Sequence, residues 1–413
     1  IDTLRASLPF WTWYSRSPHQ TGAEQEGAID LLFGNPHDMP VPGLVEAIRR
    51  HGEPRDPSWF AYMLDHAPAQ EAVAAYLQEH TGLAWAADDV ALTTGGFGAL
   101  AIAIRMLTEP GDEVVYYDPP WFFYNLLVRA AEAVPVVLSL EPPRFSPDPQ
   151  RLADAITPRT RAVILNTPHN PSGRVLEAAE LAAVAEVLRN ASARHGRPIH
   201  LLADEAYRPI VLDGRRAASP SEHYEHTIIL YSFGKQLLAP GHRLGYLALS
   251  PRIPADELVA LREAATLARF AHGWTFPSND LQRALPDLQR LCIDVGAIER
   301  RRDRLTPALA EHGFAPTFPE GTFYVLARSP DPDDLAFVER MAAERLYVLP
   351  GSLVNLPGWF RISLTASDTM VEHAAERFAR VPVAATRSGG RSSPSRTGTR
   401  SSYSERASYR RER

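Results

Sequence analysis

Residues 231–246 read YSFGKQLLAPGHRLGY and contain Lys235, the only lysine of the 413-residue chain. The other 42 of the 43 basic residues are arginine. A GC-rich codon bias explains why lysine is scarce, but it does not explain why one lysine is kept at this position. Only lysine offers a primary amine that can lose its proton and condense with a carbonyl to form a Schiff base. The stretch therefore predicts an amine with a chemical role, placed directly after a strand.

An alternation of apolar strands and helices surrounds this stretch. Strands are expected at 90–94, 113–118, 134–140, 162–166, 199–203, 227–232 and 244–250. Helical patterns separate most of them, notably at 99–107, 122–132 and 178–194. This alternation predicts an α/β domain with a mostly parallel seven-stranded sheet between helices. Ligands of such sheets bind at the carboxyl ends of the strands.

A smaller α+β domain is expected from the two ends of the chain. The opening stretch, to about residue 43, reads as irregular and aromatic. After a long helix at 279–312, short strands at 322–327, 346–349 and 360–364 accompany helices at 335–344 and 369–380. We expect residues 1–45 to form an N-terminal arm and part of the small domain, 46–278 the large domain and 279–382 the C-terminal small domain. Residues 383–413 are rich in Ser and Arg, so disorder is expected there.

Composition and charge exclude several classes of protein. The net charge is -6, and the eight arginines and two glutamates from residue 383 onward leave -12 for the rest of the chain, which argues against nucleic acid as a partner. Cys292 is the only cysteine, which excludes an internal disulfide and a cysteine-based metal cluster. No apolar run approaches the ~18 residues that span a bilayer, and residues 1–16 lack the pattern of a secretory signal. A cytoplasmic protein without membrane association is expected.

Several unusual residues follow the predicted strands. TTGGFGAL (93–100) joins a strand to a helix through two glycines, which exposes backbone amides at a helix N-terminus as a phosphate site, although such a pair is also common in tight turns. DPPWFFYN (118–125) places Trp121 where it can stack on a planar ring, whereas Phe122 and Phe123 are more typical of core packing.

Polar groups follow the next strands. NTPHNPSGRV (166–175) is a turn signature that also offers the amide of Asn170 as a donor. LLADEAYRPI (201–210) ends a strand with Asp204, followed by Tyr207. A buried carboxylate needs a cation or a protonated ring nitrogen, and a helix cap is the alternative role for Asp204.

Two arginines complete the pattern. Ser232 and Arg243 flank Lys235 and together suit a phosphate dianion, while Arg361 lies within an apolar strand, GWFRISLT (358–365), and requires an anion. The set supplies an amine, a stacking ring, an acid, hydrogen-bond donors and a phosphate cradle. Pyridoxal 5'-phosphate requires each of these, so the sequence predicts this cofactor and no metal.

The ordered motifs NPSG, ADEAY, SFGK with an arginine eight residues after the lysine, and FRIS resemble the class I/II aminotransferases. These belong to the aspartate aminotransferase superfamily, which is made up of fold type I pyridoxal-phosphate enzymes. The resemblance covers about residues 29–380. It implies that Lys235 forms the internal aldimine and shuttles the proton. It also implies cofactor contacts from Asp204 to the pyridinium nitrogen, from Asn170 and Tyr207 to the phenolic oxygen, from Trp121 to the ring, and from Gly96, Phe97, Ser232 and Arg243 to the phosphate.

The same resemblance implies an assembly and a substrate site. Tyr62 is similar to the tyrosine that such enzymes lend to the neighbouring subunit's phosphate, which implies a homodimer with shared active sites. Arg361 would grip the substrate's α-carboxylate, with Gly34 and Asn170 close by. The implied substrates are an amino acid and a 2-oxo acid.

Some residues depart from the family pattern. Gly234 stands before the lysine where many relatives have serine or threonine, and Phe97 replaces a small polar residue. RFAHGWTFPSN (269–279) does not align Arg269 with the second arginine of aspartate-specific relatives; His272 or Ala271 falls nearer. These departures argue against a dicarboxylate substrate. Trp13, Tyr14, Phe122 and Trp274 favour a bulky or aromatic one, or else belong to the core.

The expected function is transamination between an L-amino acid and a 2-oxo acid. A lyase, a decarboxylase or a specialised biosynthetic amino-acid enzyme is the alternative, because the same cofactor supports each of these reactions. An effector-sensing domain of a transcription regulator would need an N-terminal DNA-binding motif, for which the roughly 30 residues before the first core strand leave no room. The basic tail reads equally as a partner tether or as unselected sequence.

Overall fold

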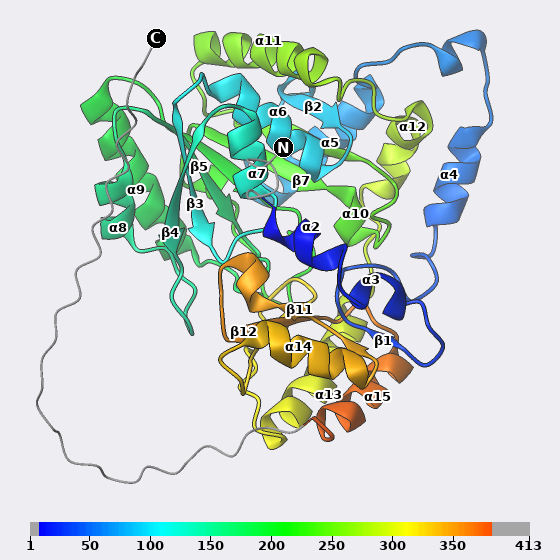
Figure 1. The fold of residues 1–413 in the computed structure, drawn as a ribbon. Coiled ribbons are helices and arrows are strands. Elements are labelled where there is room, and N and C mark those ends of the chain that lie inside the picture. Colours follow the sequence, from blue (N-terminus) through cyan, green and yellow to red (C-terminus); the bar gives the residue numbers. More distant parts are fainter. Residues whose placement is uncertain (1–7, 382–413) are drawn as a thin grey trace, which may run out of the picture. The chain divides into compact units, whose positions relative to one another are not determined.

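A seven-stranded sheet lies at the centre of the fold, which is a computed structural model describing residues 8–381 (Figure 1). From one edge to the other the strands are β2 (Val90–Thr93), β8 (Gly245–Leu249), β7 (Thr227–Ser232), β6 (His200–Asp204), β5 (Thr160–Asn166), β3 (Glu113–Asp118) and β4 (Val134–Ser139). The pairs from β4 through to β7 are parallel, and β8 is antiparallel to both of its neighbours. The predicted α/β fold with a mostly parallel seven-stranded sheet is confirmed.

Both faces of the sheet are covered by helices, because side chains alternate between the two faces along each strand. On one face, Val114 and Tyr116 of β3 belong to a buried cluster with α6 (Gly96–Leu107), α7 (Tyr124–Ala130) and α11 (Ala255–His272). On the other face, Val115 and Tyr117 pack with residues of α8 (Pro149–Ala155) and α9 (Ala178–His195). Next to them, β7, β8 and β2 contribute to a cluster with α4 (Leu44–Gly52), α5 (Ala67–Thr81) and α12 (Asn279–Leu288).

The strand register brings the polar strand ends together. Asn166 of β5 lies beside Asp204 of β6, and Asp204 lies beside Leu230 of β7. Since these strands are parallel, the segments that follow them leave the sheet at the same edge. The residues predicted from three separate motifs therefore meet at one place.

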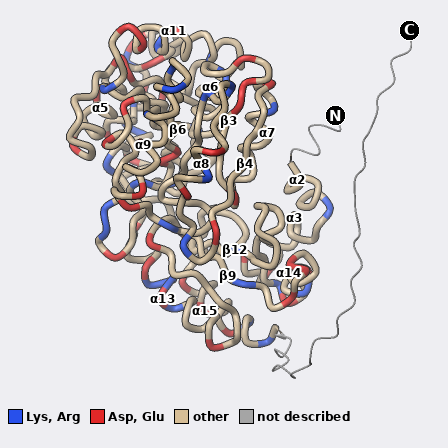
Figure 2. The backbone as a smooth tube through the Cα atoms, turned by 90° about the vertical axis from the view of Figure 1, so that its left-hand side faces the viewer, with Lys and Arg blue, Asp and Glu red and all other residues tan. Residues whose placement is uncertain are grey.

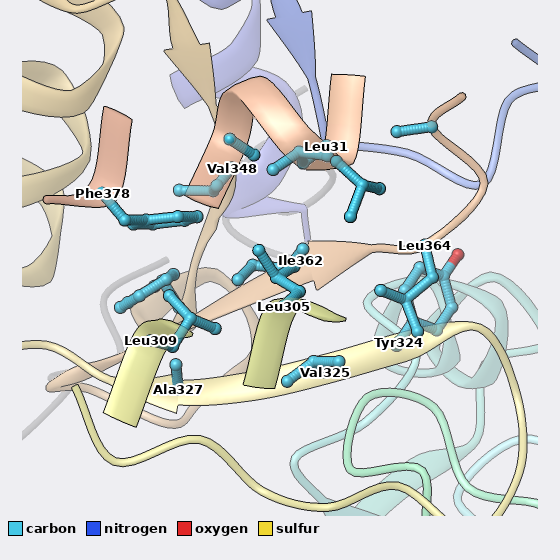
Figure 3. Close-up of a cluster of buried hydrophobic side chains, with 14 of the residues drawn as sticks. Leu31, Leu305, Leu309, Tyr324, Val325, Ala327, Val348, Ile362, Leu364 and Phe378 are labelled. Carbon is cyan, nitrogen blue, oxygen red and sulfur yellow. The ribbon is translucent and has the colours of Figure 1, made fainter. Parts of the chain in front are cut away.

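A second, smaller group of elements contains an antiparallel sheet of β11 (Leu349–Pro350), β12 (Trp359–Ser363) and β9 (Tyr324–Arg328). Helices α13 (Val295–Glu311), α14 (Asp334–Ala343) and α15 (Asp368–Phe378) accompany it. Figure 3 shows Leu305 and Leu309 of α13 packed with Ile362 of β12 and Phe378 of α15. The N-terminal strand β1 (Ile29–Asp30) pairs in parallel with β10 (Leu346–Tyr347), so the first and last parts of the described chain are joined.

The predicted helix at 279–312 is wrong in one respect, since it is two helices, α12 and α13, with a break between them. The side chain of Gln236 stabilises this break by donating from Nε2 to the carbonyl oxygens of Gln289 (3.2 Å) and Leu291 (2.7 Å). The backbone N–H of Ile293 donates in turn to the carbonyl of Gln236 at 2.8 Å. The opening stretch is also less irregular than expected, because it contains α2 (Pro9–Tyr14) and α3 (His19–Gly22).

Charged residues are distributed over the described chain, with acidic and basic positions interspersed in both the upper and lower halves of Figure 2. Within residues 8–381, no helix is both long and apolar enough to cross a membrane. The predicted disorder of residues 383–413 concerns a segment outside the described residues.

Candidate active site

A cavity of about 160 Å³ lies at the carboxyl edge of the sheet. Among the residues that line it are nine of those predicted from the sequence: Gly96, Phe97, Trp121, Asn170, Asp204, Tyr207, Ser232, Lys235 and Arg243. They come from the ends of five strands or from the segments that follow them. The sheet therefore gathers these nine residues around one small space.

Lys235 is placed in this cavity by a single turn of helix, α10 (Phe233–Gln236), that follows β7 directly. Its Nζ lies 5.7 Å from the ring centroid of Tyr207 and 5.9 Å from that of Phe323. Gly234 has a steric role here, because a Cβ at this position would come within 3.0 Å of the Cα of Pro240. The glycine that departs from the family pattern thus lets the following loop approach the lysine.

Asp204 is buried, and its carboxylate is held by Tyr124, whose hydroxyl donates to Oδ2 at 2.5 Å. The backbone N–H of Ala206 donates to Oδ1 at 3.3 Å. Burial raises the pKa of Asp204, and the hydrogen bond from Tyr124 and the charge of Lys235 oppose that rise. Tyr124 was not singled out in the sequence, where it ends an aromatic run typical of core packing.

Replacing Tyr124 by phenylalanine is expected to raise the pKa of Asp204 further, because burial is then less opposed. A protonated Asp204 cannot balance a positive ring nitrogen, so activity should fall about 10-fold or more. The acidic limb of the profile of kcat/KM against pH should also move to higher pH. Tyr116→Phe is the matched control, since Tyr116 is a buried tyrosine whose ring lies 5.8 Å from that of Tyr124. An unchanged acidic limb in Tyr124→Phe would contradict this role.

Tyr207 forms a buried hydrogen-bonded pair with Tyr324 of β9. Burial raises the pKa of Tyr207, and the partner hydroxyl raises it further. Burial acts in the same direction on Tyr324, but the charges of Arg361 and Lys235 and the hydrogen bond with Tyr207 outweigh it and lower its pKa. The two phenols therefore have unlike proton affinities, and Tyr207 is the one that lines the cavity.

Arg361 of β12 is buried beside Asn170. Its Nη1 donates to the Oδ1 of Asn170 at 2.9 Å, and its Nη2 donates to the carbonyl of Leu32 at 3.0 Å. The guanidinium stacks over the ring of Tyr324 at 3.9 Å. Among the described residues its buried Nε has no hydrogen-bond partner. Arg361 thus keeps an unused donor, and Asn170, whose oxygen is occupied, keeps its NH₂ group for the cavity that it lines.

Gly34, which the sequence predicts to lie near the substrate, packs against the rings of Phe323 and Tyr324. A Cβ at this position would come within 2.5 Å of the Phe323 ring and 3.0 Å of the Tyr324 hydroxyl. Only glycine lets the 32–35 segment pass this close to the two aromatic rings.

Two adjacent glycines lie at the start of α6, where the sequence predicts a phosphate site. Gly95, with φ of 84°, lies where a Cβ would come within 2.9 Å of Nη2 of Arg243. A Cβ on Gly96 would meet the Cβ of Ser232 at 3.0 Å. The missing side chains let an arginine and a serine approach the helix N-terminus, where backbone amides and the helix dipole favour an anion.

A chain of aromatic rings extends from the cavity to the N-terminal helix α2. Neighbouring ring centroids lie 5.3 Å apart for Trp274–Phe97, 5.2 Å for Phe97–Trp121, 6.3 Å for Trp121–Phe122, 4.4 Å for Phe122–Phe10 and 5.6 Å for Phe10–Tyr14. The sequence predicts four residues for a pocket that binds a bulky substrate, and their positions relative to these rings differ. Tyr14, Phe122 and Trp274 belong to this row of rings, while Trp13 lies beside it, 6.5 Å from the Phe10 ring and 4.7 Å from the His19 ring.

Two predicted residues behave differently from the rest. Tyr62 does not line the cavity; its side chain is 90% exposed and its ring lies 5.0 Å from that of Phe276. Arg269, considered for a second substrate carboxylate, is buried with both oxygens of Asp65 at 2.9 Å from its Nη1. That arginine is already neutralised within the chain.

Two further residues complete the framework of the site and were not predicted. Asn166 ties neighbouring strand ends together, since its Nδ2 donates to the carbonyl of Asp204 (2.8 Å) and its Oδ1 accepts from the backbone N–H of Asn170 (2.7 Å). His169 is buried between the Ser172 hydroxyl (2.6 Å) and the carbonyl of Pro119 (3.1 Å). Burial lowers its pKa to about 4, so the ring is neutral and donates from Nε2 to that carbonyl. Asn166 could have been found in the sequence as a polar amide residue at the end of an apolar strand.

These donors fit pyridoxal 5'-phosphate. The anion cradle suits its phosphate, the buried carboxylate of Asp204 suits its ring nitrogen, and the free NH₂ of Asn170 suits its phenolic oxygen. Lys235 is the one amine among the cavity residues. These groups are held in position by the protein: the two glycines let Arg243 and Ser232 approach the start of α6, Tyr124 holds Asp204, and Asn166 holds the backbone of Asn170.

Comparison with known proteins agrees with this chemistry. The profile of the family "Aminotransferase class I and II" matches residues 26–378. The chain is 30% identical over 361 residues to the aspartate/prephenate aminotransferase of Thermus thermophilus, covering 86% of this chain and 90% of that protein. It is 34% identical over 328 residues to a probable N-succinyldiaminopimelate aminotransferase of Mycobacterium tuberculosis, covering 76% and 77%. The crystal structure of an amino transferase from Eubacterium rectale superimposes with a TM-score of 0.82 at 28% identity, covering 88% of this chain and 92% of that one.

Proposed function

We propose, from the premise that this chain belongs to the class I and II aminotransferases, that it moves the amino group of a bulky or aromatic L-amino acid to a 2-oxo acid. The chain is an aminotransferase that depends on pyridoxal 5'-phosphate. The assignment of roles to residues and the choice of substrate are the proposed parts. The observation that carries them is the convergence of Lys235, Asp204 and Asn170 on one cavity at the carboxyl edge of the sheet.

The cofactor would be held by three sets of groups. The amides of Gly96 and Phe97, with Ser232 and Arg243, would bind its phosphate. Asp204 would pair with the ring nitrogen, held in orientation by Tyr124. Asn170 and Tyr207 would donate to the phenolic oxygen, and Trp121 would stack on the ring. When bound, pyridoxal phosphate supplies an electron-accepting ring that stabilises negative charge at the substrate's Cα.

Proton transfer and substrate binding are carried out by side chains of the protein itself. Lys235 Nζ takes the proton from the substrate's Cα and returns it on the cofactor side, which requires a neutral amine near the reacting atom. Arg361 binds the substrate's α-carboxylate through the Nε–H that no described residue uses. Gly34 keeps the chain next to that arginine free of a side chain. Asn170 links the two tasks, since it accepts from Arg361 and lines the cofactor cavity.

The substrate class is argued from charge and from the aromatic rings. Of the residues that line the cavity, only Lys235 and Arg243 are cationic, and both have roles toward the cofactor. Arg269 is paired with Asp65 and is not available for a second carboxylate. The row of aromatic rings from Trp274 to Tyr14 offers apolar surface instead, which favours a substrate with an aromatic or bulky side chain.

A panel of amino acids tests this substrate class. The holoenzyme is mixed with L-phenylalanine, L-methionine, L-alanine or L-aspartate, and the conversion to the pyridoxamine form is followed by absorbance. We expect kcat/KM for phenylalanine to exceed that for aspartate by about 10-fold or more. Phe122→Ala should lower the value for phenylalanine about 10-fold while leaving alanine within about twofold. A preference for aspartate would overturn the substrate class, and release of ammonia or carbon dioxide would overturn transamination.

We further propose that two copies of the chain share their active sites. An aromatic side chain as exposed as Tyr62 is unusual, and Phe60, two residues before it, is 76% exposed. This supports burial of the segment by a second copy, with Tyr62 reaching the partner's phosphate site.

The pairing of β1 with β10 supports assigning residues 1–45 partly to the small domain, next to a large domain of 46–278 and a C-terminal part of 279–382.

A further inference from the structure

Two histidines and a glutamate, residue types that can ligate a metal ion, meet at the opposite end of the sheet from the cavity. His200 is the first residue of β6, and His226 comes directly before the neighbouring strand β7. The two backbones are hydrogen-bonded there, from the N–H of Leu201 to the carbonyl of His226 at 2.9 Å. Glu257 projects from the first turn of α11, which lies at the top of Figure 1. β6 separates His200 from Asp204 by roughly 13 Å at the usual rise of a strand, so this group lies apart from the active site.

The geometry of the group converges on one point. Nε2 of His200 lies 2.8 Å and Nδ1 of His226 lies 3.1 Å from the same oxygen, Oε1 of Glu257. One ligand atom from each residue lies within 4.8 Å of the others. Among the described residues, this is the only cluster of three such side chains. One nitrogen of each imidazole ring therefore contacts the same carboxylate oxygen.

We propose that His200, His226 and Glu257 form a binding site for a divalent cation of the zinc class, which joins α11 to the amino-terminal edge of the sheet. Two imidazole nitrogens and one carboxylate oxygen are a ligand set that Zn²⁺ accepts, with water in the fourth position. Bonds of about 2.0–2.2 Å in tetrahedral geometry place neighbouring ligand atoms about 3.4 Å apart. The two nitrogen–oxygen distances need to lengthen by about half an ångström to reach that spacing, and the two nitrogens already lie within 4.8 Å of each other.

The surroundings suit a metal that enters from solvent. The three side chains are 10%, 16% and 22% exposed, which leaves an opening for the ion and its water while removing most competing solvent. An ion pair between one carboxylate and two histidines would explain the same contacts. A measurement of metal binding distinguishes this ion pair from a metal site.

Titration of the holoenzyme with ZnCl₂ tests the site. The protein is freed of tags and chelators, and binding is followed by calorimetry in a buffer without amino acids. We expect one Zn²⁺ per chain, a higher Tm when Zn²⁺ is bound, and visible ligand-field bands when Co²⁺ replaces it. His226→Gln and Glu257→Gln should each weaken binding about 100-fold and abolish the Tm shift, without changing aminotransferase activity.

A matched control is available within the chain. His51 also contacts a carboxylate, with Nε2 3.0 Å from Asp287, but it belongs to no three-ligand cluster. His51→Gln should therefore bind Zn²⁺ as the native protein does. If His226→Gln fails to fold, Glu257→Gln decides, since Glu257 lies on a helix surface. Absence of saturable binding, or equal affinity in Glu257→Gln and the native protein, would leave the group as an ion pair and overturn the proposal.

Discussion

Replacing Lys235 by alanine is expected to reduce transamination by about 10⁴-fold or more, because one substitution removes both the covalent partner of the cofactor and the base that moves the proton. No neighbouring amine can take over, since the chain has no other lysine. The surrounding cavity should remain, because the hydrogen bonds of Asp204 and Asn170 do not involve Lys235. Bound cofactor is therefore expected to stay in place and to be inactive.

Lys235→Arg is the matched variant for this prediction. It keeps the positive charge and most of the side-chain length but cannot supply a neutral amine, so it should be as inactive as alanine. Reduction with borohydride followed by mass spectrometry should fix the cofactor to the native chain and to neither variant. A small external amine should restore part of the rate in Lys235→Ala only, because arginine still fills the space. Cofactor attached to either variant would refute the assignment of Lys235.

Replacing Arg361 by alanine is expected to lower kcat/KM for amino acids by about 100- to 1000-fold. Loss of a buried, charge-assisted partner of a carboxylate costs about 3 to 4 kcal/mol, which corresponds to that factor. The effect should appear mainly in KM, since Lys235 and Asp204 are untouched. Part of it will come through Asn170, which loses the donor that holds its oxygen.

Two variants separate these contributions. Arg361→Lys keeps the charge but loses the planar fork, so it should fall between alanine and the native protein. Arg328→Ala removes an exposed arginine from the neighbouring strand β9, where it lies 5.8 Å from the Trp359 ring, and should leave KM unchanged. Melting temperature and cofactor absorbance report whether each variant is folded and loaded. A native KM for Arg361→Ala in a folded, loaded protein would remove Arg361 from the substrate site.

Much of the fold was predictable because six of the seven strands of the central sheet are largely buried on both faces, the edge strand β4 being the exception. Such strands read as short, continuous runs of Val, Ile, Leu and Ala, and all seven were found within a few residues of their ends. The site followed from the same pattern, because polar residues such as Asp204 and Asn170 stand out at the ends of apolar runs. The rule that parallel strands end at one edge then brings them together.

The missed features depend on contacts that a linear pattern does not contain. The helix expected at 279–312 breaks because Gln236, distant in sequence, supplies hydrogen bonds to residues 289 and 291. Tyr124 lies in a run of aromatic residues, and only its 2.5 Å contact with Asp204 distinguishes it from the packing residues beside it. Arg269 is a basic residue near the expected position of a substrate ligand, and only the structure shows its pairing with Asp65.

The pairing of β1 with β10 has a consequence for the order in which the chain is built. All seven strands of the central sheet have left the ribosome once residue 249 is free, and their contacts can form during synthesis. Residues 29–30 emerge before these strands, but their partner strand β10 is made after all of them. Ile29 and Leu31, which lie in the core of the smaller group of elements, can therefore be covered only after β10 has been made.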